Sequence, residues 1–153
     1  PDGEDAAVGN ADAEGKERKV LFGHTNSPDE YKRVALQLAK TYLVKNDWAA
    51  VKKTCESGIQ YDSNVADLYY LEALSLFNLS FPRSEIIPVI QKSLSSTEWV
   101  DYNMTNARVF YADLLCSTGR PFEAIEILDK APLIYSSDAE YVRIKSLYEI
   151  NSL

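Results

Sequence analysis

Small residues with apolar neighbours recur along the chain at intervals close to 34 residues. Ala39 and Ala73 are 34 positions apart, Ala112 follows after 39, and Ser146 comes 34 positions later. In the first three cases Tyr or Leu stands three positions further on. A period of this length is typical of repeats built from a pair of helices. The pattern therefore predicts an all-α fold of stacked antiparallel helical hairpins.

Capping and turn residues place the ends of about seven helices, or three and a half hairpins. Ser27, Pro28 and Glu30 form a capping box with proline at the first helical position, and Gly119 is expected to end a helix. Pro88 has no backbone N–H, so we expect it in the first turn of its helix. The expected helices cover about 28–45, 47–60, 65–78, a segment starting between 84 and 87, a segment ending at 119, 121–131, and a last helix from 137.

The 39-residue interval contains extra residues, and about four of them fall between 94 and 103. Four residues correspond to about one helical turn, and Ser95 and Glu98 have the spacing of a capping box. We therefore expect the helix after this interval to be extended at its start, with Trp99 and Tyr102 projecting beyond the stack. An irregular loop is the alternative.

The repeats resemble the tetratricopeptide repeat family over roughly residues 30–150. The best copy spans 105–136 and places Ala112, Leu115, Gly119, Ala124 and Ala131 at five of the family's positions. Small residues are needed there because the two helices of a hairpin approach closely, and neighbouring hairpins must stack to bury their apolar faces. The resemblance implies a right-handed superhelix with three and a half repeats over residues 28–153.

In this family the first helix of each hairpin lines a concave surface that binds partners. The resemblance implies a protein or peptide partner, bound as an extended peptide or a helix in an apolar concave groove. Members that grip a peptide carboxylate use Lys and Asn in this groove, but Leu36 and Leu71 occupy two of those places here. The alternative is that the central apolar side chains are partly buried and bind nothing. The implied groove residues are Leu36, Lys40, Leu43, Tyr70, Leu74, Phe77, Val109 and Asp113.

Charge is concentrated at the start of the chain. The formal net charge is −7, and residues 1–30 carry eight acidic and three basic residues. Residues 1–27 show no apolar period, so we expect an acidic, disordered tail. The rest is almost neutral, which does not favour nucleic-acid binding, because phosphate contacts depend on clustered Lys and Arg.

Candidate chemistry is sparse, and the sequence indicates a protein that is not an enzyme. His24, the single histidine, lies in the tail, and Cys55 and Cys116 are expected to be buried free thiols. No metal site, cofactor site, phosphate loop, signal peptide or membrane span is predicted. The first residue is not Met, so we expect a processed or excised piece. The tail resembles linkers of bacterial envelope proteins, which favours that location weakly.

The last helix is apolar almost all round, which is typical of a helix covered on most sides. We expect Val142, Leu147 and Ile150 to form an end-face contact with a following helix or a second copy of the chain. Two further functions therefore stay open beside the interaction scaffold. One is a structural or oligomerisation module whose end faces stack, and the other is a recruiting domain of a larger enzyme.

Overall fold

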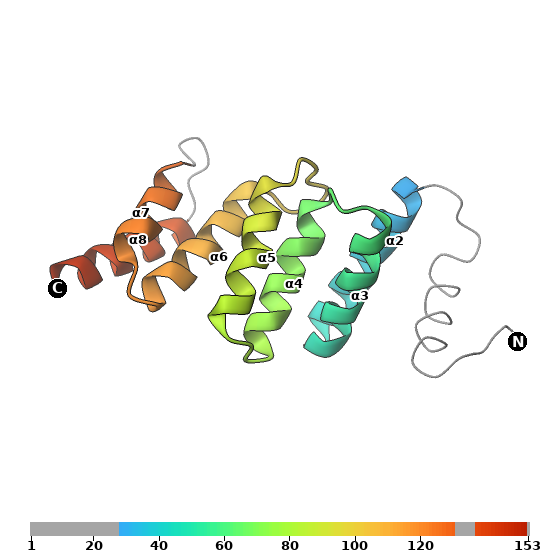
Figure 1. Ribbon diagram of the computed structural model, residues 1–153, viewed down its shortest axis with the longest axis horizontal. Coiled ribbons are helices and arrows are strands. Elements are labelled where there is room, and N and C mark those ends of the chain that lie inside the picture. The colour runs from blue at the N-terminus through green and yellow to red at the C-terminus, as the bar shows by residue number, and fades with distance from the viewer. Residues whose placement is uncertain (1–27, 131–136, 153) are drawn as a thin grey trace, which may run out of the picture.

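The structure is a computed structural model that describes residues 28–130 and 137–152. The predicted tail over 1–27 lies outside the described residues. Within them the chain is all-α, and the helices stand in one row in which each packs against the next in sequence (Figure 1). The described residues form seven helices: α2 (Pro28–Val44), α3 (Trp48–Tyr61), α4 (Ala66–Asn78), α5 (Arg83–Ser95), α6 (Met104–Ser117), α7 (Pro121–Asp129) and α8 (Ser137–Asn151).

Several helix ends lie where the sequence predicts them. The Asp47 carboxylate caps α3 by accepting a hydrogen bond from the backbone N–H of Ala50 at 3.2 Å. Asn78 is the last residue of α4, as expected. Gly119 follows α6 with φ of +81°, a conformation that side chains with a Cβ rarely adopt. These residues therefore mark the start of α3, the end of α4 and the end of α6.

Pro88 is not in the first turn of its helix, and that prediction is wrong. The helix α5 begins at Arg83, so Pro88 lies inside it. Proline removes the hydrogen bond that would reach back to the carbonyl group of Ser84. Both Pro88 and Ser84 are exposed, so water can hydrogen-bond this carbonyl group and the helix can tolerate the proline.

The predicted extension of the helix after the long interval is also wrong. Residues 96–103 form an irregular loop, and α6 begins only at Met104. Its capping box is made by Asn103 and Asn106, which bond each other's backbone N–H groups. The Ser95 hydroxyl donates to the carbonyl group of Lys92 at 3.1 Å, so it serves the end of α5 instead.

The loop 96–103 is held against the helices by a buried carboxylate. Asp67, on α4, is fully buried and accepts hydrogen bonds from the backbone N–H groups of three consecutive residues, at 2.7 to 2.9 Å. These residues are Val100, Asp101 and Tyr102. A short parallel bridge also joins Val65 to Glu98. Trp99 and Tyr102, expected to project, are therefore half-buried.

Acidic side chains of the same loop also bind α2. Glu98 accepts a hydrogen bond from the Lys32 ammonium group at 2.6 Å, and Asp101 accepts one from Lys40 at 2.9 Å. The loop therefore ties the first hairpin to the second and leads directly into α6.

The apolar core consists of two clusters that meet at one side chain. The first lies among α2, α3 and α4, and the second extends from α4 to α8. Tyr70, on α4, is half-buried and packs against both. We call it the joint between the clusters. Because the clusters follow one another along the row, each is built mainly from residues close in sequence.

Small residues let the helices approach as the repeat pattern requires. Ala39, Ala73, Ala112 and Ala124 are fully buried. Gly58 shows why a small side chain is needed, since a Cβ added there would lie 2.8 Å from Leu68 Cδ1 and 2.9 Å from the Cβ of Ala35. Three helices, α2, α3 and α4, therefore come together at Gly58.

The Cys55 thiol, on α3, and the Glu72 carboxyl group, on α4, are titratable groups close to the core whose pKa values are raised. Cys55 and Cys116 are buried free thiols, as predicted, and burial raises the pKa of the Cys55 thiol well above its usual value. The carboxyl group of Glu72, on α4, is half-buried. Loss of solvation, reinforced by Glu56, raises its pKa to about 7, against the opposing effect of Lys52 and Lys92.

Candidate functional site

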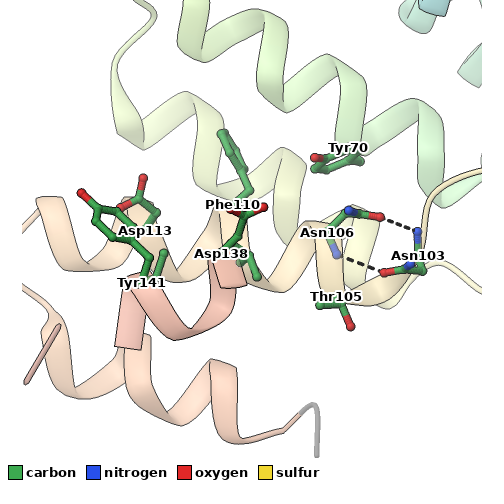
Figure 2. A pocket seen from close by; sticks show the side chains of 10 residues that line it. Tyr70, Asn103, Thr105, Asn106, Phe110, Asp113, Asp138 and Tyr141 are labelled. Carbon is green, nitrogen blue, oxygen red and sulfur yellow. Dashed lines mark hydrogen bonds between the residues drawn. The ribbon is translucent and has the colours of Figure 1, made fainter. Parts of the chain in front are cut away.

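A cavity of about 400 Å³ opens between α4, α6 and the start of α8 (Figure 2). Each of these three helices is the first helix of its hairpin. We call the side of the molecule formed by α2, α4, α6 and α8 the first-helix face, and the cavity lies on it. Its lining residues are Tyr70, Asn103, Thr105, Asn106, Val109, Phe110, Asp113, Asp138, Tyr141 and Val142.

Aromatic rings continue from the cavity along α4 and α6. Phe110 is edge-on to Tyr70, with ring centroids 6.4 Å apart, and edge-on to Phe77 at 5.9 Å. Tyr70 also contacts Tyr102 of the loop at 5.2 Å. Edge-to-face contacts of this kind hold rings in fixed orientations. The first-helix face therefore presents a preformed aromatic surface that reaches from the loop 96–103 to the end of α4.

Polar groups occupy the other walls of the cavity. Asn103 and Asn106 are fixed by their mutual capping bonds, which Figure 2 shows as dashed lines. Asp113 accepts a hydrogen bond from the Lys145 ammonium group at 2.8 Å, and this bond raises the pKa of Lys145. Asp138 lies in the first turn of α8 and is exposed.

The position of the Tyr70 hydroxyl group in the cavity wall raises its pKa. Loss of solvation, with smaller contributions from Tyr102 and Asp138, raises its pKa to about 12. The phenol is therefore neutral at physiological pH and can act as a hydrogen-bond donor or acceptor. Together the walls offer aromatic rings, carboxylates, amides and the two phenols of Tyr70 and Tyr141, and no histidine or cysteine is among them. Such a lining is suited to holding a side chain of another molecule.

The predicted groove residues of the first hairpin lie away from the cavity. Leu36 is 1% exposed and belongs to the core, so its assignment to an open groove is wrong. The position that the resemblance gave it faces the packed interior of α2, α3 and α4. Lys40 is half-buried between Asp101 and the ring of Tyr102, 5.9 Å from its centroid. Leu43 is half-buried against the first core cluster.

Most of the predicted groove residues on α4 and α6 lie in the wall of the cavity or beside it. Tyr70, Val109 and Asp113 all line the cavity. Phe77 lies next to it, 45% exposed and in contact with Phe110. Leu74 is half-buried against the first core cluster. The structure therefore brings together three of the eight predicted residues, with a fourth beside them.

The predicted end face of the last helix is only partly exposed. Val142 is 3% exposed and packs in the second core cluster, so it is not part of an outer contact surface. It points inward because α8 packs against both α6 and α7. Leu147 is 48% exposed and Ile150 is half-buried. Other large apolar side chains are exposed on the same helix, namely Tyr141, Ile144 and Tyr148.

Seven of the ten lining residues are not among the eight predicted groove residues: Asn103, Thr105, Asn106, Phe110, Asp138, Tyr141 and Val142. Asn103 was assigned to an extended helix, whereas it caps α6. Asp138 and Tyr141 could have been found by treating the last helix as the first helix of a fourth hairpin, because Ser146 continues the small-residue period. Phe110 gives no signal of its own, since it lies between two core positions of an amphipathic helix.

Comparisons with known proteins add one relative. No family model and no solved structure matches the chain. A protein of Treponema pallidum (strain Nichols) described as uncharacterized is 24% identical over 127 residues, which cover 82% of this chain and 16% of the relative. The chain therefore spans less than a fifth of the length of this relative, whose description states no activity.

The described residues offer neither a membrane-spanning helix nor a metal cluster. No helix there has the length and apolar character that crossing a membrane requires. In the same part of the chain, no three His, Cys, Asp or Glu side chains are grouped so that they could hold a metal ion.

Proposed function

We propose that the chain is a non-catalytic protein-interaction module of the tetratricopeptide type. Its hairpins would form a right-handed superhelix, and a peptide or partner helix would bind on the first-helix face. The observation that carries the proposal is the cavity between α4, α6 and α8, on which Tyr70, Val109 and Asp113 converge. A concave site with apolar walls and a few oriented polar groups is the usual form of a binding site.

The aromatic surface beside the cavity supports the same function. Phe77 is 45% exposed although its ring contacts Phe110, so a partner could cover it without rearranging the helices. Aromatic side chains in such positions contribute much of the binding energy at protein interfaces. The cavity would then hold one side chain of the partner while its neighbours pack along α4.

The test uses peptides selected from a random display library against the whole chain. Replacing Phe77 and Val109 together by Ala should weaken their binding about tenfold or more, because both side chains are partly exposed and bury apolar surface on binding. Fluorescence anisotropy of labelled peptides measures the Kd. Tyr70 is left unchanged because it joins the two core clusters.

The matched control is Phe122→Ala with Val44→Ala. These side chains, on α7 and at the end of α2, are 64% and 83% exposed, and neither lines the cavity. Their truncation should leave the Kd within about twofold, since isolated exposed side chains contribute little. Failure to select any peptide that depends on Phe77 and Val109 would contradict the proposed function.

A second candidate function is self-association through α8. Tyr141, Ile144, Leu147 and Tyr148 are each between 48% and 70% exposed on this one helix, and exposed apolar patches mark contact surfaces. Sedimentation should then detect a dimer. Leu147→Glu should raise the dissociation constant of this dimer about tenfold or more, because the change places a charge in an apolar contact. A chain that sediments as a monomer at every concentration would contradict this candidate.

A further inference from the structure

We infer that the cavity receives a basic side chain, a lysine or arginine of the bound partner. The inference rests on the proposed function and names the chemistry that the same site recognises. It follows from three features of the walls: their charge, their aromatic rings, and a similar arrangement that the chain already forms with one of its own lysines.

The charge of the cavity favours a cation. Asp113 comes from α6 and Asp138 from the first turn of α8, and both line the cavity. Lys145 already pairs with Asp113 at 2.8 Å. No ion pair joins Asp138 to another described residue, so its carboxylate leaves the site with an unbalanced negative charge. A carboxylate ligand would be repelled here, because like charges repel.

The rings of the cavity provide a second means of holding a cation. Tyr70, Phe110 and Tyr141 line it from three helices (Figure 2). An ammonium or guanidinium group is attracted to the face of an aromatic ring within about 6 Å of its centroid. The Tyr70 hydroxyl forms no hydrogen bond with the described residues and can accept one from such a group.

The same combination binds a cation elsewhere on the first-helix face. The Lys40 ammonium group lies 2.9 Å from the Asp101 carboxylate and 5.9 Å from the centroid of the Tyr102 ring. Tyr102 in turn contacts Tyr70, a wall of the cavity. The chain thus already places one of its own lysines beside a carboxylate and a tyrosine. The cavity offers the same two kinds of group, and no ion pair joins its Asp138 to another described residue.

The peptides selected for the proposed function provide the test. Each should contain a basic residue whose neutral replacement, citrulline for arginine or acetyl-lysine for lysine, weakens binding about fivefold. Asp138→Asn should weaken the unmodified peptides by a similar factor, about fivefold, and should leave the neutral peptides unaffected. Tyr141→Leu should act in the same direction because it removes a ring.

Glu140→Gln is the matched control, because it removes an equal charge from the same turn of α8 but lies outside the cavity lining. Its Kd for the unmodified peptides should change by less than about twofold. If peptides that depend on Phe77 and Val109 keep their affinity after neutral replacement, or bind Asp138→Asn as well as the original chain, this inference is overturned while the proposed function stands. If no such peptides are selected, both are overturned.

Discussion

Replacing Asp67 by Asn should lower the free energy of unfolding by about 3 kcal/mol, because a hydrogen bond to a buried charged group contributes about 1.5–3 kcal/mol and three are affected. The Asp67 carboxylate is fully buried and accepts three backbone N–H groups of the loop 96–103. An amide retains one oxygen acceptor and introduces a buried NH₂ group without a partner. Chemical denaturation followed by circular dichroism measures the change.

Asp129→Asn is the control for this substitution. It makes the same chemical change at an exposed residue of α7 whose partner is Arg143, and exposed ion pairs contribute about 1 kcal/mol or less. If the two variants lose the same stability, then Asp67 does not hold the loop. Hydrogen exchange adds a local measurement, since the amides of Val100, Asp101 and Tyr102 should lose protection in the Asp67 variant.

Replacing Glu72 by Gln should raise the free energy of unfolding at pH 8 by about 2 kcal/mol, with little effect near pH 4. Partial burial raises the pKa of this carboxyl group from 4.5 to about 7 in the folded chain. When the pH lies between these two pKa values, the folded state binds the Glu72 proton more tightly than the unfolded state does. The free energy of unfolding therefore falls as the pH rises. Glutamine stays neutral throughout and removes that loss.

The measurement is a series of denaturation curves from pH 4 to pH 8 for both chains. The difference between them should grow as pH rises through the interval from 4.5 to about 7. Glu126→Gln removes an exposed carboxylate of α7 and should change stability by about 0.5 kcal/mol or less at any pH. A difference between Glu72→Gln and the original chain that does not vary with pH would contradict the prediction.

The sequence predicts the helical hairpins well because their signals are local and repeated. The small-residue period locates Ala39, Ala73 and Ala112, all of which are fully buried. Asp47 and Gly119 define helix ends through bonds and backbone angles that involve only nearby residues. The all-α fold and most helix bounds follow from these two kinds of signal.

The errors concern features that depend on distant residues. The loop 96–103 is held by Asp67, about 33 positions earlier, and no local pattern reveals that bond. Leu36 and Val142 are buried because neighbouring helices cover them. The groove prediction for Leu36 rests on repeat positions of the family that the chain resembles, and the end-face prediction for Val142 rests on the apolar character of the last helix alone. The cavity itself depends on how α8 packs beside α6, which is why Asp138 and Tyr141 were missed.

The joint at Tyr70 has a consequence for how the helices unfold. Both core clusters include side chains of α4, and Tyr70 packs against both, so the stability of each cluster depends on α4. The cavity has walls from α4, which contributes to both clusters, and from α6 and α8, which belong to the second. A partner bound as proposed would contact α4, α6 and α8 together, and we expect it to make the described helices unfold more cooperatively.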